Sequence, residues 1–465
     1  MAETNQDEKL SLLQQLAKRN TGLDKQLKEL IGQYEKENLR NEQYTALLRE
    51  FGLADESGKD RQGVRRFKMV SMLYVVIKGF TTLTHCEDSQ EQLDRLDEIF
   101  FIISDIAQKN NLTKIPTVGD NVLLAGGITT ENKTNPIDVA VAAEKIVRSI
   151  KKYKEENNTI WDVAIGIHTG PIVARYAQKK NNPYTLAGNN VLTVSRLGRA
   201  AGSGEIVVSP MTFELIKEFY QISPYGRIPV KYSGVMDIFR LGNMLPELVD
   251  ADGNLTDEYD LRYSRLQFMD IQEFMLDMLE EQLPHNLYYH NVKHTIDVTT
   301  EVELIGWAEG LSEKDIMLLK VAALFHDSGQ IKCSKGHEEV SCEYAQKILP
   351  KYNYPQKKID EIKRIIMATQ LPHEPSDTLE AVIQDSDLDY LGRTDFVPVS
   401  NMLYKELTER GAQMTMNQWN KAQIKFISDH QYYTQTAKSL REVNKQSQIE
   451  RLKELVEECD RNGVE

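Results

Sequence analysis

The stretch that decides the fold of the second half of the chain is Tyr289-His290-Asn291-Val292-Lys293-His294-Thr295-Ile296-Asp297-Val298. It places His290 and His294 four residues apart, so on a helix the two imidazoles share one face. Two further motifs follow, the pair His326-Asp327 after the apolar run 321–325 and the acidic segment 385–389. Imidazoles and carboxylates together suit a divalent cation of hard to borderline character. The pattern therefore predicts a metal site whose ligands come from separate helices.

These motifs resemble those of the HD superfamily of metal-dependent phosphohydrolases, which is named for its His-Asp pair. Residues 289–298 also resemble the Tyr-His-Asn-x-x-His-x-x-Asp-Val motif of class I cyclic nucleotide phosphodiesterases, and the resemblance covers residues 266–460. It implies one or two bound divalent metal ions (Mn, Mg, Fe or Zn), with Asp327 essential for turnover. It also implies that His290 donates a proton to the leaving oxygen. The metal ligands that it implies are His294, His326, Asp327 and Asp385.

The chain departs from the phosphodiesterase pattern at one metal position. Those enzymes carry a second histidine four residues after the histidine of the His-Asp pair, and here that position is Gln330. His337 is the candidate to replace it, as a ligand of a second metal ion or of phosphate, and the alternative is an ordinary solvated loop residue. Asp387 and Asp389 are expected to orient the helix or the ligands without binding the metal.

The expected reaction is metal-dependent hydrolysis of a phosphoester. A bound divalent ion lowers the pKa of water and neutralises phosphoryl charge, and histidine is suited to donate a proton near neutral pH. The resemblance favours a 3′,5′-cyclic nucleotide as substrate and the 5′-monophosphate as product. Two alternatives stay open. One is an HD nucleotidase or other nucleotide phosphohydrolase with the same ligand set, and the other is a non-catalytic, nucleotide-responsive regulator.

Residues 66–243 alternate segments of strand and helix character. Strands are expected at 67–77, on both sides of a tight turn within 114–124, at 161–169 and at 205–209, with helices at 90–110 and 137–153. The block resembles the class III nucleotide cyclase catalytic domain, which implies an α+β, ferredoxin-like fold that pairs with a second copy. The residues that carry the resemblance are 77–81, 118–120, 166–171, 184–188 and Arg196.

The chain has only some of the residues that class III cyclases use for catalysis. Class III cyclases hold two metal ions through two aspartates; Asp120 matches one, but Val76 stands at the other and offers no ligand for two-metal catalysis. Pro116 and Leu192 replace the expected base-reading lysine and an asparagine of the family. Cyclase activity is therefore not expected. The block is either a nucleotide-binding regulator or a dimerisation scaffold. The candidate nucleotide-binding residues are Phe80, Thr81, Asp120, Thr185 and Arg196.

The first 55 residues have the pattern of a charged helix with a heptad seam. Leu16, Leu23 and Leu30 fall at heptad position d, whereas Asn20 and Leu27 fall at position a. Asn at position a favours a parallel pair of helices in a fixed register. Residues 1–55 are therefore predicted to form a dimeric coiled coil, and a single helix that packs on its own chain is the alternative.

A multidomain chain is expected from these observations. It consists of the coiled coil at 1–55, the α+β cyclase-like domain at 60–243, a linker at 244–262 and an all-α HD domain at 263–465. A length of 465 residues and an apolar fraction of 41% agree with several globular cores. Helices of the HD domain are predicted at 263–283, 287–308, 312–327, 337–349, 356–369, 378–390, 397–410 and from 416 onward.

The composition of the chain excludes some classes of binding partner. The formal net charge of -14 argues against binding to nucleic acid or to anionic membranes. No apolar segment reaches membrane-spanning length, and the first residues lack the regions of a signal peptide. The cysteines give neither a disulfide framework nor a zinc pattern. These features predict a cytoplasmic protein whose partners are a second copy of the chain and a nucleotide.

Overall fold

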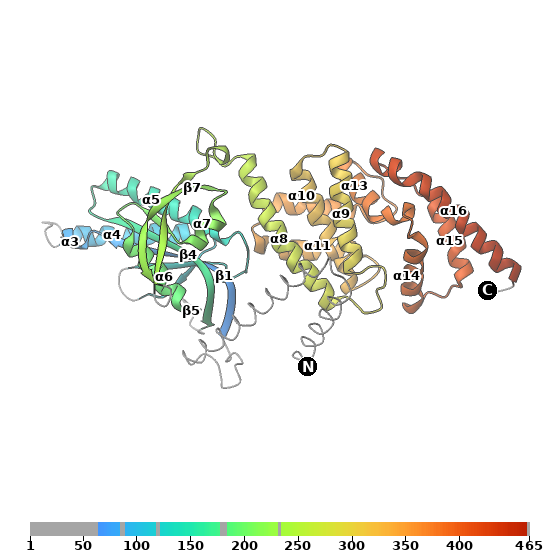
Figure 1. The fold of residues 1–465 in the computed structure, drawn as a ribbon, viewed down its shortest axis with the longest axis horizontal. Helices are drawn as coiled ribbons and strands as arrows, with labels where there is room; N and C mark the ends of the chain where they lie inside the picture. Colours follow the sequence, from blue (N-terminus) through green and yellow to red (C-terminus); the bar gives the residue numbers. More distant parts are fainter. Residues whose placement is uncertain (1–63, 84–88, 118–120, 177–183, 231–233, 463–465) are drawn as a thin grey trace, which may run out of the picture. The chain divides into compact units, whose positions relative to one another are not determined.

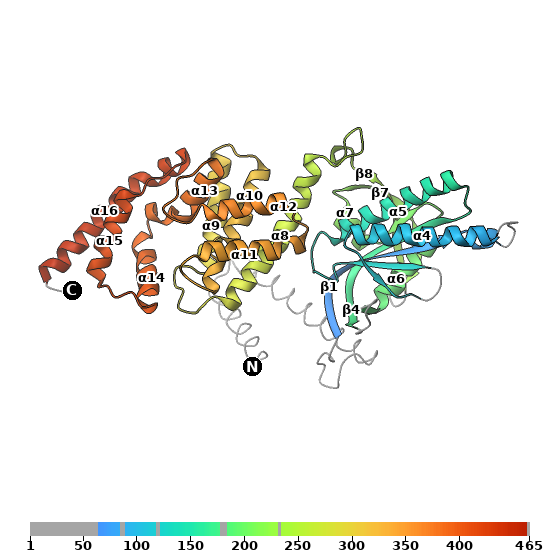
Figure 2. The ribbon, with the colours of Figure 1, turned by 180° about the vertical axis from the view of Figure 1, so that it is seen from behind.

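The computed structural model describes residues 64–83, 89–117, 121–176, 184–230 and 234–462. These residues form two compact units (Figures 1 and 2). Unit 1 holds the described residues up to Ile128 together with Val139–Glu214 and Ser223–Leu241, and unit 2 holds Thr129–Asp138, Leu215–Ile222 and the described residues from Gly242 onward. The predicted coiled coil at 1–55 lies outside the described residues.

One mixed sheet forms the centre of unit 1. Its order across the described strands is β2-β3-β1-β4-β6-β8-β7, and β5 pairs with β4 beside this path. β1 pairs antiparallel with β3 and β4, whereas β4 and β6 run parallel. The strands are β1 (Val64–Lys78), β2 (Thr113–Ile115), β3 (Val122–Gly126), β4 (Asp162–Tyr176), β5 (Tyr184–Ala187), β6 (Ile206–Val208), β7 (Tyr220–Val230) and β8 (Gly234–Met244).

Helices cover both faces of this sheet. Figures 1 and 2 show α6 over one face and α4 and α5 over the other. β1 is therefore buried on both sides, and Met72, Leu73 and Val75 have no exposed surface. This explains why β1 is a nearly continuous apolar run without polar alternation. The helices are α3 (Phe80–Leu83), α4 (Ser89–Lys109), α5 (Asn135–Asn157), α6 (Asn189–Ala200) and α7 (Pro210–Ile216).

Gly79 follows the last residue of β1. Its φ is 128°, and a Cβ at this position would lie 2.8 Å from Trp161 Cε3, so a residue with a side chain would be strained there. α3 starts at the next residue, Phe80. The predicted strands and helices of unit 1 are present, although β1 and β4 are longer than expected.

Unit 2 is helical from Asp257 onward. Its first long helix, α8, is capped by Thr256, whose side chain accepts a hydrogen bond from Tyr259 N. The helix therefore begins inside the segment 244–262 that was predicted as a linker. The helices of the unit are α8 (Asp257–Gln282), α9 (Val292–Ala308), α10 (Glu313–Phe325), α11 (His337–Ile348), α12 (Gln356–Met367), α13 (Thr378–Asp387), α14 (Phe396–Glu409), α15 (Met416–Asp429) and α16 (Gln435–Asn462). Short 3-10 turns are η1 (Pro246–Leu248), η2 (Ser328–Ile331), η3 (Leu349–Tyr352) and η4 (Asp389–Gly392).

Two predicted helices of unit 2 differ from the structure. The helix predicted at 287–308 starts only at Val292, because the Asn291 side chain accepts hydrogen bonds from Lys293 N and His294 N and caps the helix. His290 precedes α9, so the prediction that it shares a helical face with His294 is wrong. The stretch from 416 onward is two helices, α15 and α16, with the loop 430–434 between them.

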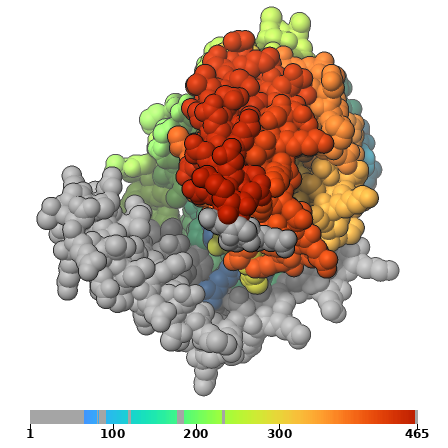
Figure 3. Space-filling model, turned by 90° about the vertical axis from the view of Figure 1, so that its right-hand side faces the viewer, coloured from blue at the N-terminus to red at the C-terminus, as the bar shows by residue number. Residues whose placement is uncertain are grey.

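Unit 2 has a large core and a smaller one. α10 supplies much of the large core, because Leu319, Ala322 and Phe325 are all buried. The smaller core joins Tyr289 and Tyr390 to α16. Figure 3 shows the face formed by the C-terminal helices, in red. Within the part of the chain that the structure describes, no helix has the length and apolar character needed to cross a bilayer.

Candidate metal centre

Three side chains, His294, His326 and Asp327, converge at one buried point in unit 2, and Asp387 lies beside the two histidines. His294 lies in the first turn of α9, His326 and Asp327 follow the last residue of α10, and Asp387 ends α13. His294 Nε2 is 3.3 Å from His326 Nε2 and 3.4 Å from Asp327 Oδ2. His326 Nε2 is 3.3 Å from Asp327 Oδ2. Asp387 Oδ1 is 3.0 Å from His294 Nε2 and 3.4 Å from His326 Nε2.

The separations among His294, His326 and Asp327 fit a single cation. Nitrogen and oxygen ligands at about 2.1 Å from one ion are themselves about 3.0 to 3.4 Å apart in octahedral or tetrahedral geometry. Asp327 Oδ2 is buried and has no hydrogen-bond partner among the described residues. A buried carboxylate oxygen without a partner is costly unless a cation lies beside it. The residues present therefore fit a divalent metal ion.

The three aspartates of segment 385–389 have three different partners. Asp387 reaches the two histidines, whereas Asp389 Oδ1 is 2.5 Å from Arg441 Nε. The carboxylate of Asp385 accepts hydrogen bonds from Tyr433 N, Thr434 N and the Thr434 hydroxyl. The carboxylate of Asp385, predicted to be a metal ligand, therefore contacts residues 433–434 and not the histidines, and Asp387 is the carboxylate of this segment that lies beside them. Positions 385 and 387 are about 200° apart around a helix, so only one of the two can face the histidines.

Backbone carbonyls orient two of the imidazoles. His326 Nδ1 donates to Ala323 O at 2.8 Å, and His337 Nδ1 donates to Ser334 O at 2.8 Å. Each ring therefore presents Nε2 to the cluster, which is the orientation expected of a metal-binding histidine. His337 Nε2 lies 3.0 Å from Asp327 Oδ1, the carboxylate oxygen that does not face His294 and His326. The structure thus brings His337 to the edge of the cluster.

Glycine at position 329 makes this placement of His337 possible. A Cβ on Gly329 would lie 2.0 Å from the carbonyl oxygen of His337, so only glycine lets η2 approach the start of α11 this closely. The Ser341 hydroxyl accepts from Gly329 N and donates to His326 O. Gln330, the position where the phosphodiesterase pattern has a histidine, accepts a hydrogen bond from Arg410 at 3.0 Å.

The electrostatics of the cluster favour cations. Burial would lower the pKa of His326, but the negative charge of Asp327 outweighs burial and raises that pKa well above its usual value. Burial would raise the pKa of Asp327, but the charge of His326 outweighs it and lowers that pKa well below its usual range. A divalent ion would take the place of protons on the imidazoles. Metal binding is therefore expected to release protons and to weaken as the pH falls.

His290 lies beside the cluster and is held by Glu406 of α14. His290 Nδ1 is 2.5 Å from Glu406 Oε1, and Glu406 Oε2 accepts the backbone N–H groups of Tyr289 and His290. Burial would raise the pKa of Glu406, but the hydrogen bonds from His290 and the backbone outweigh burial and lower that pKa. The ionised carboxylate keeps a proton on Nδ1, so Nε2 is the ring atom left to meet a ligand.

Sequence reasoning missed Glu406, which lies 116 residues after His290 in the chain. It stands in an ordinary amphipathic helix with one other acidic residue, Glu409, and no motif marks it. Its burial, with 1% of the residue exposed, is the only signal that separates it from Glu409, and burial is known only from the fold.

Two of the candidate nucleotide-binding residues of unit 1, Phe80 and Arg196, contact other residues of the unit. Phe80 packs edge-on against Trp161 with ring centroids 4.8 Å apart, and Arg196 Nη1 donates to Pro229 O at 2.6 Å. Thr185 is exposed on β5, and Thr81 belongs to α3. Asp120 lies outside the described residues. A nucleotide pocket in unit 1 stays a prediction.

Val76 stands in β1 opposite Ala164 of β4. Its side chain is partly buried and packs against the apolar clusters of the sheet. The position at which the cyclase resemblance expects a metal-binding aspartate is thus part of an apolar surface.

Both halves of the chain match known families. Residues 63–243 match the family model of the adenylate and guanylate cyclase catalytic domain, and residues 291–391 match that of the HD domain. Human retinal guanylyl cyclase 2 is 27% identical over 234 residues, which are 47% of this chain and 20% of that protein. The membrane guanylyl cyclase of Dictyostelium discoideum is 30% identical over 158 residues, which are 34% of this chain and 11% of that protein. The matches thus span only a small part of those relatives.

Two solved cyclase structures were also similar to unit 1. The guanylate cyclase domain of RhGC from Catenaria anguillulae in complex with GTP is 23% identical, with a TM-score of 0.36, over 39% of this chain and 100% of that chain. The adenylyl cyclase CyaB from P. aeruginosa is 24% identical, with a TM-score of 0.36, over 39% of this chain and 96% of that chain. On the family matches, the chain carries a domain of the adenylate and guanylate cyclase catalytic family followed by an HD domain.

Proposed function

We propose that the chain is a metal-dependent phosphohydrolase whose HD domain hydrolyses a 3′,5′-cyclic nucleotide to the 5′-monophosphate. The observation that carries the proposal is the convergence of His294, His326 and Asp327 on one point, with Asp387 and His290 beside it. The HD family match of residues 291–391 supports a metal-dependent hydrolase. The cyclic nucleotide rests on the resemblance of residues 289–298 to the phosphodiesterase motif.

In this proposal, the four ligands hold one divalent ion. When bound, the ion supplies a water of lowered pKa and neutralises charge on the phosphoryl oxygens. His337, beside Asp327 Oδ1, holds a second ion or contacts the phosphate directly. The remaining roles belong to groups that move or hold protons.

His290 is the proposed general acid. It donates the proton on Nε2 to the departing 3′ oxygen, which would otherwise leave as an unstable alkoxide. Glu406 is a positioning residue, because its carboxylate fixes the ring through Nδ1 and stabilises the protonated imidazole. Its second oxygen holds the backbone of Tyr289 and His290, so ring and main chain are fixed together.

We infer that the cyclase domain does not cyclise nucleotides and acts as a nucleotide-sensing or dimerisation module. Val76 supports this inference, because its side chain cannot bind a metal ion and packs among apolar neighbours. A homodimer is part of the proposal. It rests on the heptad pattern within residues 1–55 and on the pairing expected of cyclase domains.

Product analysis tests the proposed function. The full-length protein is incubated with Mn²⁺ or Mg²⁺ and with cAMP, cGMP or a panel of nucleoside mono- and triphosphates, and an Asp327→Ala variant is the control. Conversion of a cyclic nucleotide to its 5′-monophosphate by the wild-type protein alone is the expected result. Release of phosphate or nucleoside from linear nucleotides alone would make the HD domain a nucleotidase. A metal-loaded protein without turnover of any substrate would favour a non-catalytic regulator.

A further inference from the structure

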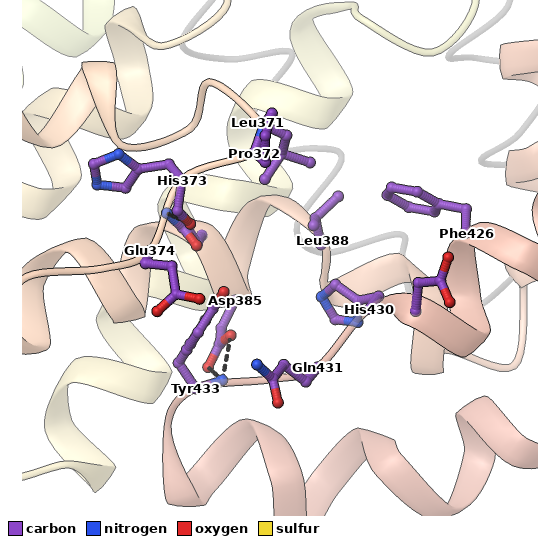
Figure 4. Close-up of a pocket in the computed structure, with 12 residues that line it drawn as sticks. Leu371, Pro372, His373, Glu374, Asp385, Leu388, Phe426, His430, Gln431 and Tyr433 are labelled. Carbon is purple, nitrogen blue, oxygen red and sulfur yellow. Dashed lines mark hydrogen bonds between the residues drawn. The ribbon is translucent and has the colours of Figure 1, made fainter.

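Unit 2 contains a cavity of about 550 Å³ that is distinct from the metal centre. It is lined by the segment 371–374 after α12, by the last turns of α13, and by the end of α15 with its loop to α16 (Figure 4). None of the four proposed metal ligands lines it. A smaller cavity of about 140 Å³ includes His294 and Asp387 and therefore belongs to the metal centre. The large cavity has no role in the proposed hydrolysis.

Gln384 lines the cavity and carries a buried hydrogen-bond acceptor. Its Nε2 donates to Ala368 O at 2.7 Å and to His373 O at 3.2 Å, which assigns the amide orientation. Its Oε1 is buried and has no hydrogen-bond partner among the residues that the structure describes, and only 3% of the residue is exposed. A buried carbonyl oxygen without a partner destabilises the folded protein. An N–H donor from a ligand would remove that destabilisation.

His430 supplies a second unsatisfied polar atom. Its Nδ1 is buried and without a partner in the described part of the chain. Burial, together with the nearby charge of Lys445, lowers the pKa of the ring to about 4, so the imidazole is neutral near neutral pH. A neutral ring offers one donor or one acceptor at this nitrogen. Figure 4 shows His430 pointing toward Leu388, with Phe426 beyond it.

The charged lining selects against anions. Glu374, Asp385 and Asp429 line the cavity, and no lysine or arginine among the described residues does. Asp385 is already saturated by the N–H groups and hydroxyl of residues 433–434, whereas Glu374 and Asp429 are available to accept hydroxyl or amine protons. A phosphate group would meet like charge here. The rings of Phe426 and Tyr433 supply flat apolar surface.

We propose that this cavity binds an uncharged, flat heteroaromatic molecule with an amine donor, the chemical class of the amine-bearing nucleosides. The amine donates to Gln384 Oε1, a ring atom or hydroxyl pairs with His430 Nδ1, and the ring lies against Phe426 or Tyr433. Sugar hydroxyls donate to Glu374 and Asp429. The volume lies within the range of small-molecule sites. The site is separate from the proposed hydrolytic reaction and does not depend on it.

Binding to the full-length protein tests the proposal. Adenosine, guanosine, cytidine and their 5′-monophosphates are titrated separately by calorimetry, without any turnover measurement. At least one nucleoside is expected to bind, with at least tenfold weaker binding of its 5′-monophosphate to the cavity. Absence of binding by all three nucleosides at millimolar concentration would overturn the proposal.

Two matched variants locate the binding. Leu371 lines the cavity and is 47% exposed, whereas Leu440 on α16 is 46% exposed and does not line it. Leu371→Trp fills the opening and is expected to weaken nucleoside binding at least tenfold, and Leu440→Trp should leave it unchanged. Phe426→Ala, a second change at a partly exposed lining position, should weaken it at least fivefold. Nucleoside binding that survives both Leu371→Trp and Phe426→Ala lies elsewhere and refutes the assignment, as does 5′-monophosphate binding that is equally tight and equally sensitive to Leu371→Trp.

Discussion

The HD domain of this chain retains the side chains of a metal site, whereas the cyclase domain retains the fold but lacks one expected metal-binding side chain. In the HD domain, side chains of suitable chemistry from α9 and α10 meet at distances that fit one cation, and Asp387 of α13 lies beside them. In the cyclase domain, the sheet and the stop at Gly79 are present, but Val76 stands where the family resemblance expects a metal-binding carboxylate. The comparison shows that the fold depends on buried apolar surfaces, so it can be retained when a metal-binding residue is replaced. The five predictions below test this contrast.

The largest effect is expected from Asp327→Ala. The change removes a proposed metal ligand and the only described contact between the cluster and His337, so turnover should fall by roughly 10³-fold or more. Product formation and the metal content of the purified protein measure it. Asp252→Ala, at an exposed loop position, is the matched control and should change neither. Full activity of Asp327→Ala after metal depletion would contradict the proposed mechanism.

The next effect separates the neighbouring aspartates of α13. Asp387→Asn should weaken metal affinity by about 10–100-fold, because it removes a charged ligand next to His294. Asp385→Asn should retain the metal but lose about 1–3 kcal/mol of stability, since an amide nitrogen would face the N–H groups of Tyr433 and Thr434. Metal content and urea unfolding are the two measurements. The reverse pattern would restore the sequence-based assignment of Asp385.

Glu406→Gln tests the orientation of His290. Metal content should be unchanged, but turnover should fall about tenfold, because the protonated ring loses its charged partner. The metal content, kcat and KM of wild type and variant are the measurements. A reduced rate that comes with loss of metal or with a raised KM would indicate a purely structural role for Glu406.

A smaller, pH-dependent effect is expected at Glu380 in the first turn of α13. Burial would raise its pKa, but hydrogen bonds from Ser376, His373 and Arg364 outweigh burial and lower the pKa to about 2. The stabilisation is therefore complete above the unfolded pKa of about 4.3 and is lost as pH falls toward 2. Glu380→Gln should cost about 2–3 kcal/mol at pH 7 and progressively less below pH 4. Denaturant unfolding between pH 3.5 and pH 7 measures it, and a pH-independent loss would argue against this ionic contribution.

The smallest effect is expected in the cyclase domain. Neither the wild-type protein nor Val76→Asp should convert ATP or GTP to a cyclic product with Mn²⁺, because Pro116 and Leu192 also depart from the family pattern. Chromatography of the reaction measures this. Cyclic product from the wild-type chain would remove the contrast between the two domains.

The elements of the fold were predictable where local chemistry determines them. The double-sided burial of β1 is visible as a continuous apolar run, and Gly79 marks its end. Helix starts were harder to predict. The side-chain hydrogen bonds that cap α8 and α9 fix where each helix begins, and helical periodicity alone does not reveal them. Thr256 and Asn291 are the residues that decide these boundaries.

The sequence by itself determined the order of the domains, the residue types of the metal centre and three of its four proposed ligands, His294, His326 and Asp327, because short motifs carry that information. Only the tertiary structure decided that Asp387 and not Asp385 faces the histidines. That outcome depends on the loop between α15 and α16, whose N–H groups donate hydrogen bonds to the carboxylate of Asp385. It also decided that Glu406 holds His290. Both outcomes depend on contacts between residues far apart in the chain, and a helical period alone does not specify which face of α13 or α14 meets the cluster.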